Sequence, residues 1–521
     1  MVKAFLAGCG SWVIHVAAGA ALLFVSGCAS LPRSPDRETA WSLSPSSEGL
    51  LHESRQAVLE GANEEASAFL LLDENAEALQ WRLALIDQAT RSIDLQYFIW
   101  ESDEVGRLIF ERVIAAWKRG VRVRILVDDL PSKMSDQGTA ELSRREGFYI
   151  RRFNPHRSRS GKVRPALEWL FFLRDLNPRM HNKLMVVDGQ WAIVGGRNIG
   201  NPYFGLSKKY NFLDLDVLVT GSVVPELGVA FDDFWNSEAA YPGESMSGRM
   251  SQRTQERRAR KFVDAIKKDQ ELLSQTEFIQ APFGPDHFNA LPQRMVPGVA
   301  VYLQDEPVVR GDRGKRLTEQ LAQLTDEHAH ETIMVSPYFI PPDELVEYIG
   351  RATRAGSDIT ILTASLGANN QTATHSHYKK YRKRLVDAGA QLHEFRHEPS
   401  EAVNAMTGTA PVEADFTSLH VKGIIQDRRH VYVGSLNLDP RAMVLNTENI
   451  LAIDSPALAE EILAHLDEVL QPENAWQIKR NSRGALRWYA GEEKARRQPA
   501  RSFRQRVADW ILRWFPIESQ L

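Results

Sequence analysis

Apolar positions in the first half of this chain switch repeatedly between helical and strand spacing. Residues 76–90 and 106–119 carry apolar side chains at every third or fourth position, which predicts amphipathic helices. Residues 93–100 and 121–127 are short apolar runs bounded by polar or turn residues, which predict buried strands. Helices that alternate with buried strands are typical of an α/β protein whose sheet is flanked by helices.

The second half repeats this order of strand, helix and strand, in residues 332–340, 342–354 and 359–363. The tripeptide Tyr-Phe-Ile occurs in both first strands, at residues 97–99 and 338–340, a separation of 241 (338 − 97). A long internal repeat indicates two copies of one folding unit.

A polar motif, His-x-Lys-x4-Asp, also occurs twice, starting at His181 and at His420, 239 residues apart (420 − 181). Each copy continues into a second apolar run that ends in glycine and then asparagine. Asn198 and Asn437 are again 239 residues apart (437 − 198), so the whole block repeats at one spacing. The members of the two blocks are His181, Lys183, Asp188, Gly195, Gly196, Asn198 and His420, Lys422, Asp427, Gly434, Ser435, Asn437.

These residue types suit chemistry on a phosphodiester. Residues i and i+2 of a strand share a face, so the imidazole and the ammonium of His-x-Lys project together. A lysine is a point charge for phosphoryl oxygens. A histidine can act as nucleophile or as proton carrier near neutral pH. Asp188 and Asp427 complete the candidate catalytic motif, but at a turn they are expected to fix loop geometry and not to touch substrate.

The duplicated motif resembles the signature of the phospholipase D superfamily. The strings at residues 179–183, 195–200 and 203–204 resemble more closely the bacterial cardiolipin synthases, particularly those of the C type. The likeness runs from about Leu83 to the C-terminus, with Gly196 where the family usually has Ser. It implies a duplicated fold of two α-β-α sandwich domains related by a pseudo-twofold axis, with the active site at their interface.

The resemblance also implies roles for individual residues, without any metal or other cofactor. One histidine attacks phosphorus to form a phosphatidyl-histidine and the other protonates the leaving group. Family precedent favours His181 as nucleophile and His420 as acid, but the near-symmetry of the copies leaves both assignments open. Asp214 is implied to orient an imidazole, with Asp216 as second candidate, and Glu448 occupies the corresponding place in the second half. The residues expected to bind phosphate or to support the site are Asn198, Asn437, Ser435, Asp214 and Glu448.

Composition narrows the alternatives. The chain has 521 residues, enough for two domains, and a net charge of −4, which does not favour nucleic acid as a partner. Its two cysteines, Cys9 and Cys28, lie in the N-terminal segment, so no disulfide is expected in the folded body. His375-Ser-His377 lacks an evident third metal ligand. His375 with Tyr378 either lines a headgroup pocket or is a helix-start histidine without a ligand.

The N-terminus has the pattern of a secretory signal, with Lys3 before a long uncharged segment. Residues 25–28 resemble a bacterial lipobox, which predicts cleavage before Cys28 and lipid attachment to its thiol. The alternative is an uncleaved transmembrane anchor, because the apolar run is long enough to span. Either hypothesis places the protein in the bacterial cell envelope facing the periplasm, and Ala29 after the cysteine suggests the outer membrane.

The chain is predicted to be a monomer that divides into six segments. Residues 251–268 are dense in charge, which indicates a solvated helix. Residues 479–521 carry eleven Lys or Arg against four Asp or Glu, with Phe503, Trp510 and Trp514 at helical spacing. This tail either binds a membrane surface or docks on the folded body. The segments are a signal peptide 1–27, a tether 28–66, a first domain 67–250, a linker 251–296, a second domain 297–478 and a basic tail 479–521.

Three functions follow from these patterns. The first is a transferase that makes cardiolipin from phosphatidylglycerol, with phosphatidylglycerol or phosphatidylethanolamine as donor. The second is a hydrolase of the same fold, acting on phospholipids or, less in keeping with the composition, on nucleic acid. The third is a tethered lipid-binding protein without turnover, which two intact copies of the motif argue against.

Overall fold

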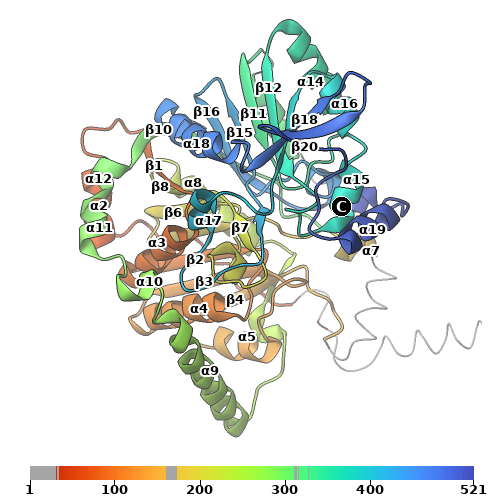
Figure 1. Cartoon of the computed structure of the whole chain (residues 1–521). Helices are drawn as coiled ribbons and strands as arrows, with labels where there is room; N and C mark the ends of the chain where they lie inside the picture. The colour runs from red at the N-terminus through yellow and green to blue at the C-terminus, as the bar shows by residue number, and fades with distance from the viewer. Residues whose placement is uncertain are drawn as a thin grey trace, which may run out of the picture.

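The computed structural model describes Leu31 and residues 35–159, 173–309, 314, 316–326 and 328–520. The signal peptide predicted at 1–27 and Cys28 lie outside these residues. Figure 1 shows the chain as two lobes, one mostly red to yellow and the other mostly green to blue. Within the described ranges, no helix is both long and apolar enough to cross a lipid bilayer.

The first half forms a mixed sheet in which three adjacent strands are parallel and the other pairings are antiparallel. In spatial order the strands are β1 (Ser67–Leu72), β8 (Asp216–Gly221), β6 (Trp191–Gly195), β5 (Leu184–Val187), β2 (Ser92–Tyr97), β3 (Arg122–Asp128), β4 (Phe148–Phe153) and β9 (Ala240–Pro242). The signature strand β5 therefore lies in the middle of the sheet.

The second half repeats this order strand for strand. Its strands are β10 (Val296–Gln304), β17 (Asn449–Asp454), β16 (His430–Gly434), β15 (Gly423–Gln426), β11 (Glu331–Val335), β12 (Asp358–Ala364), β13 (Gln391–Phe395) and β18 (Ala475–Arg480). Two further strands, β19 (Leu486–Ala490) and β20 (Glu493–Ala495), extend the sheet beyond residue 478, where the sequence placed the end of the domain. Antiparallel pairing of β1 with β10 joins the two sheets.

Helices and sheets alternate in five layers. One outer layer holds α3 (Asn75–Gln88) and α4 (Glu104–Lys118), and the other holds α14 (Asp343–Ala355) and α16 (Arg382–Asp387). The central layer contains α8 (Val224–Trp235) and α18 (Pro456–Val469), and its apolar core takes side chains from both sheets. Alternate residues of a strand serve different layers, as in β5, where Leu184 and Val186 face the central core and Met185 the outer one. The predicted duplicated α-β-α architecture is confirmed.

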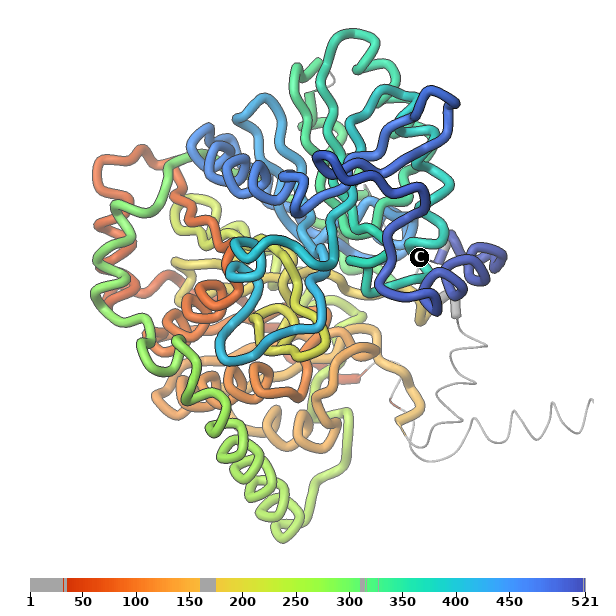
Figure 2. The backbone as a smooth tube through the Cα atoms, in the orientation of Figure 1, coloured from red at the N-terminus to blue at the C-terminus, as the bar shows by residue number. Residues whose placement is uncertain are grey.

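The remaining described helices connect these layers or cover their edges. They are α2 (Leu50–Val58), α5 (Asp136–Ser143), α7 (Leu173–Leu176), α9 (Gln252–Leu273), α10 (Glu277–Gln280), α11 (Pro285–Asn289), α12 (Leu291–Arg294), α13 (Leu317–Leu324), α15 (Thr372–Tyr378), α17 (Glu401–Thr407) and α19 (Phe503–Leu512). Figure 2 shows α9 projecting from the body of the protein, as expected for the charge-dense segment.

Strand register corrects one detail of the repeat. Gln96 of β2 pairs with Leu184, and Val335 of β11 pairs with Gly423, so both positions are separated by 239 (335 − 96 and 423 − 184). The repeat therefore extends upstream of the motif at one spacing. The two Tyr-Phe-Ile tripeptides are separated by 241 residues, two more than the repeat of the strands, so their alignment is wrong. Tyr338 instead corresponds to Ile99 of the first half.

Part of the segment predicted as a tether is packed against the first domain. The Ser42 amide donates to Asp232 Oδ2 at 2.7 Å, and Leu51 of α2 is buried. The Leu51 carbonyl accepts a hydrogen bond from the indole of Trp191 at 2.9 Å. The tether prediction is therefore wrong for residues 35–58, because hydrogen bonds from their backbone and polar side chains, together with buried Leu51, hold them on the first domain.

Candidate active site

The first signature histidine enters the site beside a segment of the other half. Met180 forms an isolated parallel bridge with Thr447, and the His181 amide donates to the Thr447 carbonyl at 2.9 Å. This pairing places His181 next to Glu448, with 2.8 Å between Nδ1 and Oε2. The Ser435 hydroxyl donates to the same carboxylate oxygen. The imidazole from one half is thus held by a carboxylate from the other.

The second histidine is held in the reciprocal way. β14 (Thr417–Leu419) pairs in parallel with β7 (Asn211–Leu213), and the His420 amide donates to the Leu213 carbonyl at 2.8 Å. His420 Nδ1 then lies 2.5 Å from Asp214 Oδ2. The structure brings both acids that the resemblance suggested onto imidazoles, and each pair crosses between the two halves.

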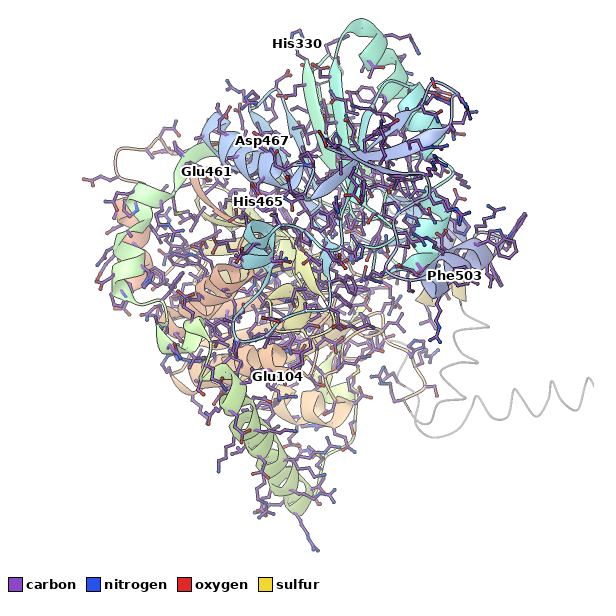
Figure 3. The ribbon with its side chains drawn as sticks, viewed as in Figure 1. Glu104, His330, Glu461, His465, Asp467 and Phe503 are labelled. Atoms are coloured by element: carbon purple, nitrogen blue, oxygen red, sulfur yellow. The ribbon has the colours of Figure 1, made fainter. Side chains whose placement is uncertain are left out.

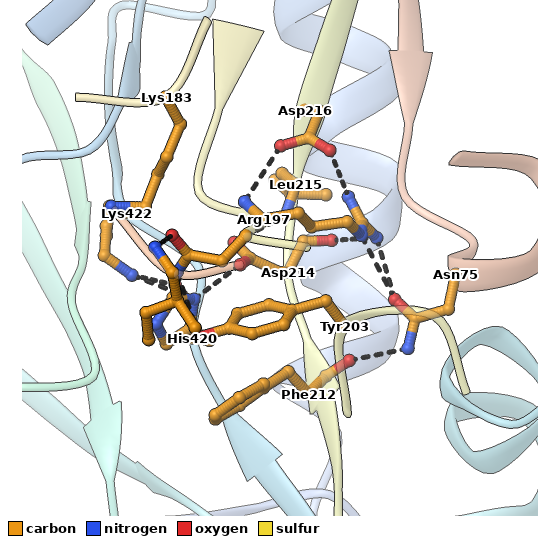
Figure 4. Close-up of polar contacts among 12 residues, drawn as sticks. Asn75, Lys183, Arg197, Tyr203, Phe212, Asp214, Leu215, Asp216, His420 and Lys422 are labelled. Carbon is orange, nitrogen blue, oxygen red and sulfur yellow. Dashed lines mark hydrogen bonds and ion pairs between the residues drawn. The ribbon is translucent and has the colours of Figure 1, made fainter. Parts of the chain in front are cut away.

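Asp216, the second candidate, contacts neither histidine. Arg82 donates to its carboxylate at 2.7 Å and Arg197 at 3.2 Å. Arg197 also donates to the Asp214 carbonyl at 2.7 Å, as Figure 4 shows. Asp216 therefore anchors the arginine that supports the loop of Asp214.

Both signature lysines are buried beside their histidines. Lys183 Nζ donates to the His181 carbonyl at 2.5 Å, and Lys422 Nζ donates to the His420 carbonyl at 2.6 Å. Figure 4 shows the two lysines next to each other. Burial lowers the pKa of Lys183 to about 7 and that of Lys422 to about 8. Two ammonium groups at one buried point favour an anionic ligand between them.

The same surroundings keep the imidazoles neutral. Burial and the charge of Lys422 lower the pKa of His420 to about 3, and burial with Lys183 and Lys422 holds the pKa of His181 well below 6.5. A neutral imidazole that donates Nδ1–H to a carboxylate leaves the lone pair of Nε2 available as nucleophile.

The two carboxylates differ in their ionisation. Burial raises the pKa of Glu448 to about 7. Burial alone would raise the pKa of Asp214 too, but His420 and Lys422 hold it below the usual value of 3.8. The half-sites are therefore similar in sequence and unequal in electrostatics.

The two asparagines also have different surroundings. Asn198 Oδ1 accepts from the Ile99 amide at 3.0 Å, and its Nδ2 donates to the Tyr203 hydroxyl at 2.9 Å. Asn437 is buried and its Oδ1 has no hydrogen-bond partner. The Tyr203 ring lies edge-on to His420, with 5.3 Å between centroids. Sequence reasoning gave Tyr203 no role in the site, although it stands in the string that carries the resemblance.

Gly196 stands where the second half has Ser435, and its surroundings explain the difference. A Cβ at Gly196 would lie 2.3 Å from Asp214 Oδ1, closer than real Cβ contacts occur. The short Asp214 side chain thus occupies the space that a larger residue at position 196 would need.

The motif aspartates lie at the far end of their strands from the histidines. Asp188 is fully buried at the turn after β5, where its carboxylate accepts hydrogen bonds from Thr90, Arg91 and Ser92. Asp427 accepts from the Glu331 amide at 2.9 Å. Their inclusion among catalytic groups is wrong, and their contacts agree with the expected role in loop geometry.

His375 does not line a headgroup pocket. It is buried in α15, where Nδ1 lies 2.9 Å from Asp509 Oδ1 and Nε2 lies 2.8 Å from an Arg382 nitrogen. The Tyr378 hydroxyl donates to Glu394 at 3.1 Å. Both groups belong to a polar cluster that binds the C-terminal helix. Among the described residues no group of three or more His, Cys, Asp or Glu could hold a metal ion.

The duplicated α/β fold, with a histidine and a lysine from each half beside a carboxylate of the other, defines the class of the phospholipase D-like proteins. The family model described as "Cardiolipin synthase, PLD-like domain" matches residues 83–235 and 323–470, and the chain belongs to this family. Its members are phospholipid-modifying enzymes of the phospholipase D superfamily, and so is this protein.

Individual relatives agree with this assignment. Cardiolipin synthase C of Escherichia coli (strain K12) is 33% identical over 465 residues, which cover 86% of this chain and 94% of that protein. Cardiolipin synthase 1 of Bacillus cereus is 23% identical over 413 residues, 79% of this chain and 68% of that protein. The crystal structure of phosphatidylserine synthase from Haemophilus influenzae Rd KW20 shares the fold, with a TM-score of 0.53, 15% identity, and coverage of 82% of this chain and 91% of that chain.

Proposed function

We propose that this protein is a phosphatidyltransferase that forms cardiolipin from phosphatidylglycerol and a second phospholipid, either phosphatidylglycerol or phosphatidylethanolamine. The observation that carries the proposal is the reciprocal pairing of His181 with Glu448 and of His420 with Asp214. It supplies two oriented imidazoles, one for each side of a phosphodiester. Similarity to cardiolipin synthase C supports the choice of lipid.

In the first step the Nε2 lone pair of His181 attacks the phosphorus of the donor lipid. The bond from phosphorus to the headgroup oxygen breaks, and His420 gives its proton to that oxygen. The product is a phosphatidyl-histidine and a free headgroup alcohol, glycerol or ethanolamine. The negative phosphodiester offsets the charge of the lysines and raises the pKa of His420, so that the imidazole is protonated when substrate is bound.

In the second step the terminal hydroxyl of a phosphatidylglycerol attacks the same phosphorus. Its proton returns to His420, the phosphorus–nitrogen bond breaks, and the electron pair goes back to His181. Two further groups act on substrate. Tyr203 accepts from Asn198, so its own hydroxyl hydrogen is free to bind a phosphoryl oxygen. The unpartnered Oδ1 of Asn437 accepts from the hydroxyl of the incoming lipid.

Lipid analysis tests the proposal. Purified protein is incubated with phosphatidylglycerol, with and without phosphatidylethanolamine, and the expected product is cardiolipin. Phosphatidic acid as sole product would instead make the protein a hydrolase of the phospholipase D type, in which water takes the place of the acceptor alcohol.

Two histidine variants test the covalent route. His181→Gln and His420→Gln should each reduce headgroup release by about 10³-fold or more, because each removes a group that handles the phosphorus or the proton. His330→Gln, on an exposed side chain at the edge of the protein in Figure 3, is the matched control and should leave the rate unchanged. Full activity in His181→Gln would exclude this histidine as the nucleophile.

We also propose that the protein is a lipoprotein of the cell envelope, attached through Cys28, facing the periplasm and sorted to the outer membrane. Metabolic labelling with a clickable fatty acid should mark the protein. Cys28→Ala should lose the label, whereas Cys9→Ala should keep it. A protein that retains Met1 and carries no label would be held by an uncleaved anchor.

A further inference from the structure

The C-terminal helix α19 is attached to the second domain through its acidic side chain. Asp509, the only acid within α19, is 1% exposed. Its carboxylate lies 2.9 Å from His375 Nδ1, 2.5 Å from Lys379 Nζ and 2.8 Å from Gln498 Nε2. Buried ionic contacts of this kind fix the rotation of the helix about its own axis. The opposite face of α19 is therefore held outward.

The next acid along the chain is also turned inward. Glu518 accepts from the Tyr381 hydroxyl at 2.7 Å and is paired with Lys380 and His377. Asp509 and Glu518 are the only acids in residues 503–520, so every negative side chain of this segment is paired with the body. The cations of the segment remain on the outside, because Arg504, Arg506 and Arg513 are exposed.

The outward face is apolar and aromatic. Six of the fourteen large exposed hydrophobic side chains among the described residues fall within residues 503–515, so they form one patch on a small part of the surface. They are Phe503 at 76% exposed, Val507 at 38%, Trp510 at 56%, Ile511 at 45%, Trp514 at 67% and Phe515 at 52%. Figure 3 places Phe503 at the periphery of the protein. The guanidinium of Arg513 lies 4.6 Å from the Trp514 ring, so cation and aromatic face share the patch.

This segment adjoins the elements that carry the active site. Gln505 Nε2 donates to the Leu366 carbonyl at 2.6 Å, and the Arg501 guanidinium lies 3.4 Å from the Phe416 ring centroid. Phe416 directly precedes β14, the strand that leads to His420. On the other side, Arg441 donates to the Gln520 carbonyl at 3.3 Å, and the charge of Arg441 contributes to the low pKa of His181.

We propose that the outward face of α19, together with Trp514 and Phe515, docks on the surface of an anionic phospholipid bilayer. The aromatic rings enter the interfacial region, and Arg504, Arg506 and Arg513 bind lipid phosphates. This surface is independent of the phosphatidyl-transfer chemistry. It brings the active site to its substrate in the plane of the membrane.

Charge favours lipid over a second copy of the chain as the occupant. A twofold dimer built on this face would bring the same exposed arginines of two copies together, with no acid of the segment left to neutralise them. An anionic bilayer offers lipid phosphates to the arginines and an apolar interior to the aromatic side chains at the same surface.

A label on the helix tests the docking. Cys9 and Cys28 are the only cysteines, so the full chain with both changed to serine carries a single thiol when Val507→Cys is added. Val229→Cys is the matched control, on an exposed valine of α8. An environment-sensitive fluorophore at position 507 should shift to the blue with vesicles of phosphatidylglycerol and phosphatidylcholine, and not with phosphatidylcholine alone, and the label at position 229 should not respond.

No shift at position 507 while the protein sediments with the vesicles would overturn the proposal. A shift that depends on protein concentration without vesicles would also overturn it and indicate a dimer. Trp510→Ser with Trp514→Ser should weaken the binding of the labelled chain to anionic vesicles by about 10-fold or more. If the transferase proposal is right, the double variant should keep its turnover of short-chain, soluble phosphatidylglycerol and lose turnover on vesicles. The fluorescence result stands whether or not cardiolipin is formed.

Discussion

Asp214 and Glu448 show how near-identical motifs give unequal half-sites. The shorter acid lies against Gly196, whereas the longer acid lies against Ser435 and accepts its hydroxyl hydrogen. The smaller residue, Gly196, is thus paired with the shorter acid, and the larger residue, Ser435, with the longer acid. The family usually has Ser at position 196, and the glycine here leaves room for the carboxylate of Asp214.

Replacement of Gly196 should test this fit. Gly196→Ala places a methyl group where the Asp214 carboxylate now lies, so Asp214 should move away from His420. A displacement of about 1 Å in a positioned catalytic group can lower turnover by about 10²-fold. The measurement is kcat for headgroup release. Gly248→Ala, at a glycine whose Cβ would meet nothing within 4 Å, is the control, and equal activity of both variants would contradict the role given to Gly196.

The lysines predict how activity depends on pH. In the free enzyme the pKa of Lys183 is about 7 and that of Lys422 about 8, and an ammonium binds phosphate only while it is protonated. As pH rises through this range both positive charges are lost, so kcat/KM should fall by about 10-fold or more between pH 7 and pH 9. Arginine stays charged throughout, so Lys183→Arg should move the start of the fall up by about one pH unit, towards the pKa of Lys422. An unchanged profile would show that Lys183 does not govern it.

The turns after β5 and β15 show a second asymmetry, between elements that look alike in sequence. The carboxylate of Asp188 accepts from three backbone amides and one hydroxyl, whereas Asp427 accepts from one amide. The first turn is covered by residues 43–46, whereas Asp427 in the second turn is exposed.

Alanine variants should therefore differ in stability. Asp188→Ala leaves four donors without their acceptor and should lower the free energy of unfolding by about 3 kcal/mol or more. Asp427→Ala should cost less than about 1.5 kcal/mol. Thermal unfolding measures the difference, and activity per folded molecule should survive in both. If Asp188 were catalytic, Asp188→Ala would instead lose activity while its stability stayed unchanged.

Elements with a strong local pattern could be predicted from the sequence. The helices α3, α4 and α14 and the strands β2 and β3 lie where apolar spacing predicted them, because a helix or strand that packs on a core must present one apolar face. The packing of residues 35–58 could not be predicted, since they contact the first domain mainly through hydrogen bonds, which leave no apolar spacing in the sequence. Nor could the role of His375, whose partner Asp509 lies 134 residues away.

The protein as a whole is held together by more than its linker. The central apolar core contains side chains from both sheets, β1 pairs with β10, and His465 of α18 lies 3.0 Å from Asp73 of the first half. Figure 3 shows His465 where the two lobes meet. By contrast, α9 is exposed along most of its length.

Limited digestion with trypsin should show whether the linker helix α9 or the contacts between the two halves hold the protein together. The first cuts are expected in α9, at exposed sites between Arg253 and Lys268. The two fragments should still elute together from a sizing column and retain activity, because the shared core and the crossed carboxylates do not depend on the linker. Fragments that separate without denaturant would show that α9 holds the halves together.

The sequence by itself determined the duplicated α/β fold and the set of paired histidines, lysines and asparagines, because apolar spacing and motif spacing are local properties of a chain. Only the tertiary structure decided which carboxylate serves which histidine. His181 and Glu448 are 267 residues apart and His420 and Asp214 are 206 apart, and packing of the two domains against each other brings these pairs together. The fit at Gly196 and the outward face of α19 likewise follow from contacts between distant segments, which no local pattern encodes.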